Sequence, residues 1–272
     1  MSHGSGHPWE SGPRDLFRVR FGDDVDAFDR TRPVAPDVTF DDLTRLARLP
    51  PRSAVLEIGP GTGHATRPLA ERGLRIRALE TDPRLAERAS RNLSRFSDVV
   101  ISTTSFERWD AGRAAFDAVF ACNSFHWVDP DVAFVKAAAV LHPAGHLAVL
   151  STPVVVPGYA DRFWWDVQDD WIAVGAGRVD PATKHPELVG DHGSAVEASG
   201  VFQGATVTRH PFDVSLTADE YVANLSTQSG VKQLTLKAQA DLLGRVRRRI
   251  EDGGGRLTVH HLAVLTVAKR AE

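Results

Sequence analysis

Short apolar runs alternate with helical patterns through the middle of the chain, from about residue 50 to residue 153. Each run is bounded by Gly, Pro or charged residues, as buried strands commonly are, and the runs lie at 54–58, 76–79, 99–102, 116–122 and 146–151. Apolar residues at helical spacing predict helices between them, at 65–72, 83–93 and 132–141. This alternation predicts βαβ units and a sheet covered by helices on both faces. We therefore predict an α/β fold with a doubly wound, Rossmann-like mixed sheet of seven strands.

The flanking segments have weaker patterns. An apolar helical stripe precedes Pro50 and Pro51, and three tryptophans stand among Gly and Pro residues after residue 153. Later strands at 205–210 and 257–268, separated by helices at 218–227 and 234–251, would add an antiparallel edge to the sheet. The predicted organisation is a disordered N-terminus (1–14), a helical cap (15–49), the sheet core (50–153), an inserted lid over a substrate (154–200) and a C-terminal completion of the sheet (201–272).

Composition narrows the classes of partner. The chain has 32 basic and 35 acidic residues, so no overall positive charge is present to attract nucleic acid or an anionic membrane. Its apolar runs are too short to cross a bilayer, and its N-terminal residues show no basic stretch followed by an apolar run. With Cys122 as the single cysteine, an internal disulfide is impossible. We expect a cytoplasmic monomer or homodimer whose partner is a small-molecule substrate.

The first strand runs into a glycine-rich turn, Gly59-Pro60-Gly61-Thr62-Gly63, which a helix follows. Glycines there permit a tight turn and a close approach of the backbone to a ligand. A dinucleotide site has the pattern Gly-x-Gly-x-x-Gly, with a pyrophosphate at the helix N-terminus. Here the third glycine comes one residue early, and Glu57 precedes the first glycine by two residues. A carboxylate at that position disfavours a phosphate and suits a cationic ligand.

A second acidic residue marks the end of the next strand. Glu80 lies 21 residues after Gly59, the interval at which a strand-end carboxylate meets ribose hydroxyls in nucleotide-binding folds. Asp82 is a better candidate for capping the helix that begins at Pro83. The glycine turn and Glu80 together predict a nucleoside site.

These segments resemble, in order and spacing, the motifs of class I S-adenosylmethionine-dependent methyltransferases. The matching stretches are 55–63, Glu80, 103–107, 116–127 and 141–147. Within that class the chain is similar to the small-molecule branch that includes trans-aconitate methyltransferase-like proteins, from about residue 28 to 153, and more weakly over 218–229. The resemblance implies that the core binds S-adenosylmethionine, which leaves as S-adenosylhomocysteine. The motifs say little about the methyl acceptor. The Gly- and Trp-rich lid with arginines beside it favours an acidic or phenolic metabolite, methylated on a carboxylate or phenol oxygen.

The resemblance also implies roles for individual residues. Glu80 would accept the ribose hydroxyls, Glu57 would stabilise the ammonium end of the cofactor, and Phe106 would stack on the adenine. Phe28 stands where this branch usually has a tyrosine, so a hydroxyl is lost there. The full set of implied cofactor-binding residues is Phe28, Glu57, Gly59, Pro60, Gly61, Gly63, Glu80, Thr81, Ser105, Phe106, Asn123, Ser124 and Phe125.

Catalytic and substrate-binding residues have two interpretations each. His126 follows the fourth strand and could be a general base, or its ring could pack under the cofactor and fix the loop. Candidate substrate-binding residues are Trp127, Trp164, Trp165 and Arg32. However, Trp164, Val167 and Trp171 also have the spacing of a helix that buries one face, and Arg32 could belong to a solvated basic face.

No metal site is predicted. His260 and His261 are adjacent in a predicted strand, where neighbouring side chains point to opposite faces, so they could not bind one ion together.

Two alternatives remain open. One is a methyltransferase-fold protein that binds S-adenosylmethionine without transferring a methyl group. The other is an NAD-dependent oxidoreductase, against which the early third glycine and Glu57 argue.

Overall fold

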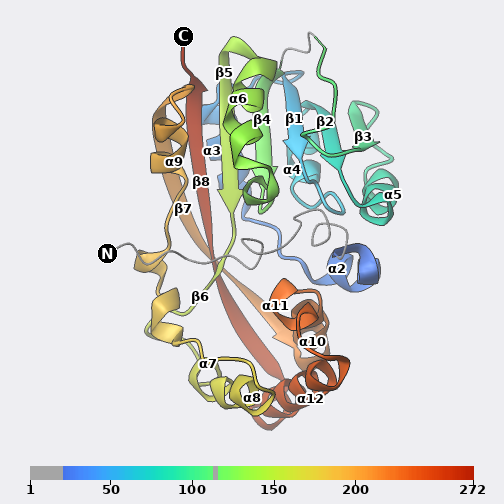
Figure 1. Ribbon diagram of the computed structural model, residues 1–272, viewed down its shortest axis with the longest axis vertical. Helices are drawn as coiled ribbons and strands as arrows, with labels where there is room; N and C mark the ends of the chain where they lie inside the picture. The colour runs from blue at the N-terminus through green and yellow to red at the C-terminus, as the bar shows by residue number, and fades with distance from the viewer. Residues whose placement is uncertain (1–20, 113–115) are drawn as a thin grey trace.

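A computed structural model describes residues 21–112 and 116–272 of the chain. In these residues one mixed sheet of eight strands has the order β3-β2-β1-β4-β5-β8-β6, with β7 paired to β8 (Figure 1). Its parallel part consists of β1 (Ala54–Ile58), β2 (Arg75–Glu80), β3 (Val99–Thr103), β4 (Phe116–Cys122) and β5 (Leu141–Ser151). The strand order reverses between β1 and β4, which is where doubly wound folds bind ligands. The predicted α/β class is confirmed.

Three strands complete the sheet. β8 (Arg256–Arg270) is antiparallel to β5, and β7 (Phe202–Thr217) pairs with β8 along nearly its whole length. The two-residue strand β6 (Val154–Val155) also lies beside β8 and brings the described strands to eight, where the sequence predicted seven. Both β7 and β8 are longer than their predicted apolar runs, because each supplies the other's hydrogen-bonding partner.

Helices bury both faces of the sheet. One hydrophobic cluster joins the sheet to α3 (Asp37–Leu46) and α4 (Thr66–Glu71), and a second joins it to α6 (Pro130–Val140) and α9 (Gly193–Ala198). Another helix, α5 (Pro83–Asn92), packs against β2 and β3 at the edge of the sheet.

The predicted start of α5 is confirmed. The Asp82 side chain accepts a hydrogen bond from the Arg84 N–H, and Pro83 occupies the first turn, where its missing N–H is not needed.

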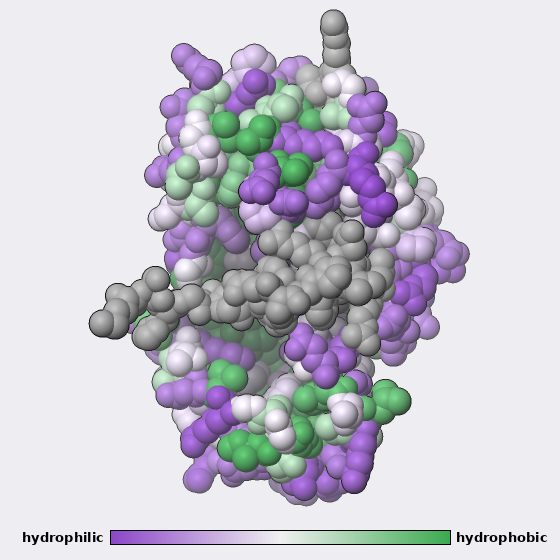
Figure 2. All heavy atoms as spheres, in the orientation of Figure 1, coloured by the Kyte–Doolittle hydropathy of each residue, from purple (hydrophilic) through white to green (hydrophobic). Residues whose placement is uncertain are grey.

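The far ends of β7 and β8 carry a third hydrophobic cluster, formed with helices, which we call the second lobe. Its helices are α7 (Phe163–Asp166), α8 (Gln168–Ala173), α10 (Ala218–Ser226), α11 (Ser229–Lys232) and α12 (Leu236–Asp252). The stretch predicted as one lid is thus divided, since α7 and α8 join the second lobe whereas α9 packs on β7. Figure 2 shows hydrophilic residues over much of the sheet region and of the second lobe in this view, with apolar patches on each.

A short helical segment lies between the sheet and the second lobe. It consists of the 3-10 helix η2 (Phe21–Asp24) and α2 (Val25–Thr31), and α2 contacts both α5 and α10 (Figure 1). The prediction of disorder for residues 1–14 lies outside the described residues. Three further 3-10 turns are η3 (Phe125–Trp127), η4 (Pro181–Lys184) and η5 (Pro186–Leu188). None of the helices in the described part of the chain combines the length and apolar character that a membrane crossing requires.

Candidate active site

The glycine-rich turn that follows β1 has a backbone that only glycine adopts without strain. Gly59, Gly61 and Gly63 have φ angles of +65°, +60° and +92°. Space is limited as well, because a Cβ at position 59 would lie 2.7 Å from Cβ of Ser124. A Cβ at position 61 would lie 3.2 Å from Cε1 of Phe28. The turn therefore brings bare backbone to the carboxyl edge of the sheet.

Glu80, at the end of β2, holds this turn in place through hydrogen bonds. Its carboxylate accepts hydrogen bonds from the Gly61 N–H at 2.9 Å and from the Asp82 N–H at 3.0 Å. The Thr81 hydroxyl donates to it at 3.4 Å. Burial raises the pKa of Glu80, and the backbone donors act in the opposite direction. The structure thus places Glu80 against the glycine turn, as the spacing of the two strands predicted, with Thr81 next to it. Their cofactor-binding roles stay predictions.

Glu57 lies two residues before the turn and is fully buried. Neither of its carboxyl oxygens has a hydrogen-bond partner, and the buried hydroxyl of Thr66 on α4 is also without one. Burial raises the pKa of Glu57 to about 8. The Thr66 hydroxyl, which is near Glu57 but outside hydrogen-bond geometry, opposes this shift, and the charge on Glu80 adds to it. A buried, unpartnered carboxyl is costly for a protein to keep. The group fits a ligand that brings a positive charge to this edge of the sheet.

The residues after β4 connect three strand ends. Asn123, at φ +52°, exchanges two side-chain hydrogen bonds with Thr152 after β5, at 2.7 and 2.8 Å. The Ser124 hydroxyl donates to the Ile58 carbonyl at the end of β1. Phe125 is buried and packs edge-on against another ring of the core. Ser124 thus lies beside the glycine turn, and the side chains of Asn123 and Ser124 join the ends of β1, β4 and β5. The role of these residues as a cofactor wall stays a prediction.

The loop after β3 holds the two residues predicted to flank an adenine. The Ser105 hydroxyl accepts a hydrogen bond from the Arg108 N–H at 3.2 Å. Phe106 is 2% exposed and belongs to the core cluster under α6, with Nζ of Lys136 5.4 Å from its ring centroid. A stacking role would require this ring to face the cleft, and it stays a prediction.

The predicted catalytic pair lies in the 3-10 turn η3. His126 is exposed and Trp127 is half-buried, with ring centroids 5.3 Å apart. The turn directly follows β4, so both side chains are close in sequence to the strand ends that carry the site. Their roles stay predictions.

The tryptophans of the predicted lid divide between core and surface. Trp164 is 6% exposed and packs edge-on against Phe163 and Tyr221 in the second lobe. Trp165 is 38% exposed. The spacing of Trp164 and Val167 therefore matches a helix that buries one face, and this packing by itself accounts for Trp164.

Arg32 follows α2, and its guanidinium carbon lies 4.6 Å from the centroid of the Phe28 ring. Its Nη2 donates to the Thr227 hydroxyl at 3.3 Å. Sequence reasoning missed Thr227, which is 195 residues away in the chain. The available signal was the weak resemblance of 218–229 to the methyltransferase branch.

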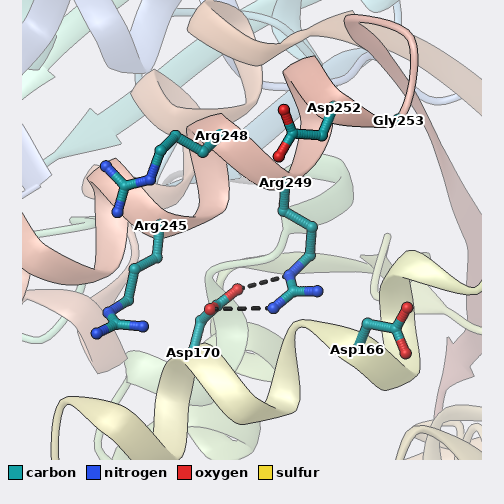
Figure 3. Close-up of a pocket in the computed structure, with 7 residues that line it drawn as sticks. All are labelled: Asp166, Asp170, Arg245, Arg248, Arg249, Asp252 and Gly253. Atoms are coloured by element: carbon teal, nitrogen blue, oxygen red, sulfur yellow. Dashed lines mark hydrogen bonds and ion pairs between the residues drawn. The ribbon is translucent and has the colours of Figure 1, made fainter.

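A charged cavity of about 450 Å³ lies apart from these residues, in the second lobe. As Figure 3 shows, it is lined by Asp166, Asp170, Arg245, Arg248, Arg249, Asp252 and Gly253. Asp170 and Arg249 form a two-point ion pair across it, at 2.7 and 3.1 Å, which joins α8 to α12. Neither in this cavity nor elsewhere in the described residues does a group of three or more His, Cys, Asp or Glu side chains have the arrangement to hold a metal ion.

The strand order and the helices on both faces are those of the class I methyltransferase fold. Residues 56–149 match a family described as a methyltransferase domain. The chain thus carries the class I fold and matches that family over these residues.

Individual relatives agree with this assignment. A methyltransferase of uncharacterized function from Mycobacterium tuberculosis is 33% identical over 137 residues, which are 50% of this chain and 53% of that protein. The chain thus matches about half the length of this relative.

Two solved structures share the fold. A protein from Anaeromyxobacter dehalogenans, described as a Type II methyltransferase, has a TM-score of 0.61 and 19% identity, covering 88% of this chain and 97% of its own. Phosphoethanolamine N-methyltransferase 2 from Haemonchus contortus, in complex with S-adenosyl-L-methionine, has a TM-score of 0.53 and 13% identity, covering 94% and 60%.

Proposed function

We propose that this protein transfers a methyl group from S-adenosylmethionine to a small-molecule acceptor. The observation that carries the proposal is the glycine turn with its two carboxyl groups, Glu80 tied to the Gly61 N–H and Glu57 buried without a partner. An unpartnered acid suits a ligand with an ammonium and a sulfonium, and it disfavours the pyrophosphate of NAD.

Each carboxyl group has a distinct role in this proposal. Glu80 accepts the ribose hydroxyls while it keeps the turn in place. Glu57 gives up its proton when the ammonium end of the cofactor arrives, because a nearby positive charge favours the carboxylate. Binding of the cation thus relieves the cost of a buried acid that has no hydrogen bonds.

When bound, S-adenosylmethionine supplies an activated methyl group, so the chain has mainly to position an acceptor. In-line displacement needs the acceptor atom at roughly 3–3.5 Å from the methyl carbon. We propose an oxygen acceptor, a carboxylate or a phenol of a metabolite, with Trp127 and Trp165 beside it. A phenol must lose a proton, which His126 would take, whereas a carboxylate needs no base.

Titration calorimetry with S-adenosylhomocysteine tests the cofactor assignment. We expect binding in the micromolar range and a loss of affinity of about tenfold or more in Glu80→Ala, since that change removes the ribose acceptor and the anchor of the turn. The control Glu87→Ala changes a carboxylate of α5 that is 70% exposed, and it should bind as the wild type does.

Two results would redirect the assignment. Binding of NADH without binding of S-adenosylhomocysteine would favour the oxidoreductase. Cofactor binding with no release of S-adenosylhomocysteine across a panel of phenols and carboxylic acids would favour a protein that binds without transferring methyl.

A further inference from the structure

Arg32 is partly buried, and no Asp or Glu of the described residues neutralises its positive charge. Its Nε is buried and has no hydrogen-bond partner, and within residues 21–112 and 116–272 it pairs with no Asp or Glu. Burial lowers the pKa of Arg32 to about 10. Other arginines are placed differently, since Arg88 pairs with Asp29 and Arg249 with Asp170.

The two groups that do contact this guanidinium are neutral. The Thr227 hydroxyl accepts from Arg32 at 3.3 Å while it donates to the Asn224 carbonyl at 2.7 Å. The Phe28 ring contributes a cation–π contact, with the guanidinium carbon 4.6 Å from the ring centroid. Neither contact supplies the negative charge that a partly dehydrated guanidinium lacks. An anion beside Arg32 would supply it.

The Arg32 guanidinium lies close to the glycine turn, with the Phe28 ring between them. The Phe28 ring on which it stacks is the one that a Cβ at Gly61 would contact at 3.2 Å. Burial lowers the pKa of His64, next to the turn, and the charge on Arg32 acts in the same direction. Both observations put Arg32 beside the proposed cofactor cleft.

The opposite side of Arg32 belongs to the second lobe. Thr227 follows α10, and Asn224 on α10 donates from Nδ2 to the Thr31 carbonyl at 2.9 Å. The end of α2 is therefore held by α10 at two consecutive residues. An anion bound by Arg32 would lie where the sheet, α2 and the second lobe meet.

We propose that Arg32, held by Phe28 and Thr227, is a carboxylate-binding site of this protein. A planar guanidinium with a free edge matches a carboxylate through two parallel hydrogen bonds. The inference rests on the proposed function, because two carboxylates could reach the site: that of the methionine part of the cofactor and that of an acidic acceptor.

Two nucleosides distinguish the sources. S-adenosylhomocysteine carries a carboxylate, and 5′-methylthioadenosine lacks the whole amino-acid end beyond the sulfur. If the cofactor occupies Arg32, then Arg32→Gln lowers the affinity for S-adenosylhomocysteine about 10- to 100-fold and leaves that for 5′-methylthioadenosine within about twofold. If the acceptor occupies it, both affinities stay within about twofold of the wild type.

Succinate, a simple carboxylate probe, completes the test through thermal unfolding at constant ionic strength with chloride as reference. We expect succinate to raise the unfolding temperature of the wild type and not that of Arg32→Gln. Saturating S-adenosylhomocysteine should abolish this effect if the cofactor occupies the site, whereas the effect should persist if the acceptor does. The effect should persist with 5′-methylthioadenosine in either case.

Control variants separate binding from folding. Arg30→Gln removes an exposed arginine of α2 and should behave as the wild type. Arg32→Lys keeps the charge without the planar fork and should bind more weakly than the wild type. Without ligand, Arg32→Gln should unfold at the same or a higher temperature than the wild type, because a costly buried charge is removed.

The proposal is overturned if Arg32→Gln weakens both nucleosides equally, or if succinate stabilises both proteins alike. If the wild type binds neither nucleoside but shows succinate stabilisation that depends on Arg32, the proposed function fails and the carboxylate site stands.

Discussion

Replacing Glu57 by Gln should change how the stability of the ligand-free protein depends on pH. Burial raises the pKa of Glu57 from 4.5 to about 8, so the folded protein holds a proton that the unfolded chain has released between these values. The stabilisation from this proton is complete below pH 4.5 and is lost as the pH rises to 8. At about 1.4 kcal/mol per pH unit, the loss is at most about 5 kcal/mol.

The Gln variant has no proton to lose and nearly the same shape. Urea unfolding of both proteins at pH 5, 6, 7, 8 and 9 measures the effect. The unfolding free energy of the wild type should fall relative to that of Glu57→Gln by at most about 1.4 kcal/mol per pH unit up to pH 8, and the two curves should then run parallel. Glu87→Gln, at an exposed site, is the control and should follow the wild type. Parallel curves for wild type and Glu57→Gln from pH 5 to 9 would refute the reasoning.

The ionisation of Glu57 should also make the affinity for S-adenosylhomocysteine depend on pH. Because the ammonium of S-adenosylhomocysteine favours ionised Glu57, the wild type should release a proton on binding and bind more tightly as the pH rises from 6 to 8. Calorimetry in buffers of different ionisation enthalpy detects the released proton. Glu57→Gln should bind more weakly overall, with no release of this proton; equal proton release from both proteins would assign it to another group.

Two further changes test the packing. Gly59→Ala should lower the unfolding free energy by about 1–3 kcal/mol more than Gly204→Ala. Both residues have a φ of +65°, but only at position 59 would the new Cβ lie against Ser124. Equal losses in urea unfolding would contradict this close contact. Asp170→Asn should lower the unfolding free energy by about 1–3 kcal/mol, because it breaks the ion pair with Arg249. The control Asp169→Asn, at an exposed position, should leave the unfolding free energy unchanged. An unchanged value for Asp170→Asn would show that the pair adds no net stability.

Local sequence patterns were sufficient for the strands that form the site. The predicted bounds 54–58 and 116–122 are those of β1 and β4. Both strands are buried on two faces, so their apolar runs are continuous and end sharply at polar or glycine residues. The placement of Glu80 beside the glycine turn also followed, since the carboxyl ends of adjacent parallel strands meet at one edge.

Hydrophobic patterns predicted the bounds of a strand less well where the strand forms mainly because a neighbouring strand pairs with it. The apolar run at 205–210 marks less than half of β7, which spans Phe202–Thr217. Its remaining residues alternate between partly buried and exposed and become a strand because β8 pairs with them. β6 has two residues, too few to give a pattern.

The sequence by itself determined the parallel part of the sheet, its glycine turn and the two acidic residues at its edge, because these depend on neighbours within a few residues or on the next strand. Only the tertiary structure decided which charges stay without a partner. Arg32 could have belonged to a solvated face, and its burial against Thr227 arises from a contact across 195 residues. Likewise Asp170 meets Arg249 across 79 residues to join the two halves of the second lobe. Burial and pairing of a charge depend on everything that surrounds it, and no local pattern contains that information.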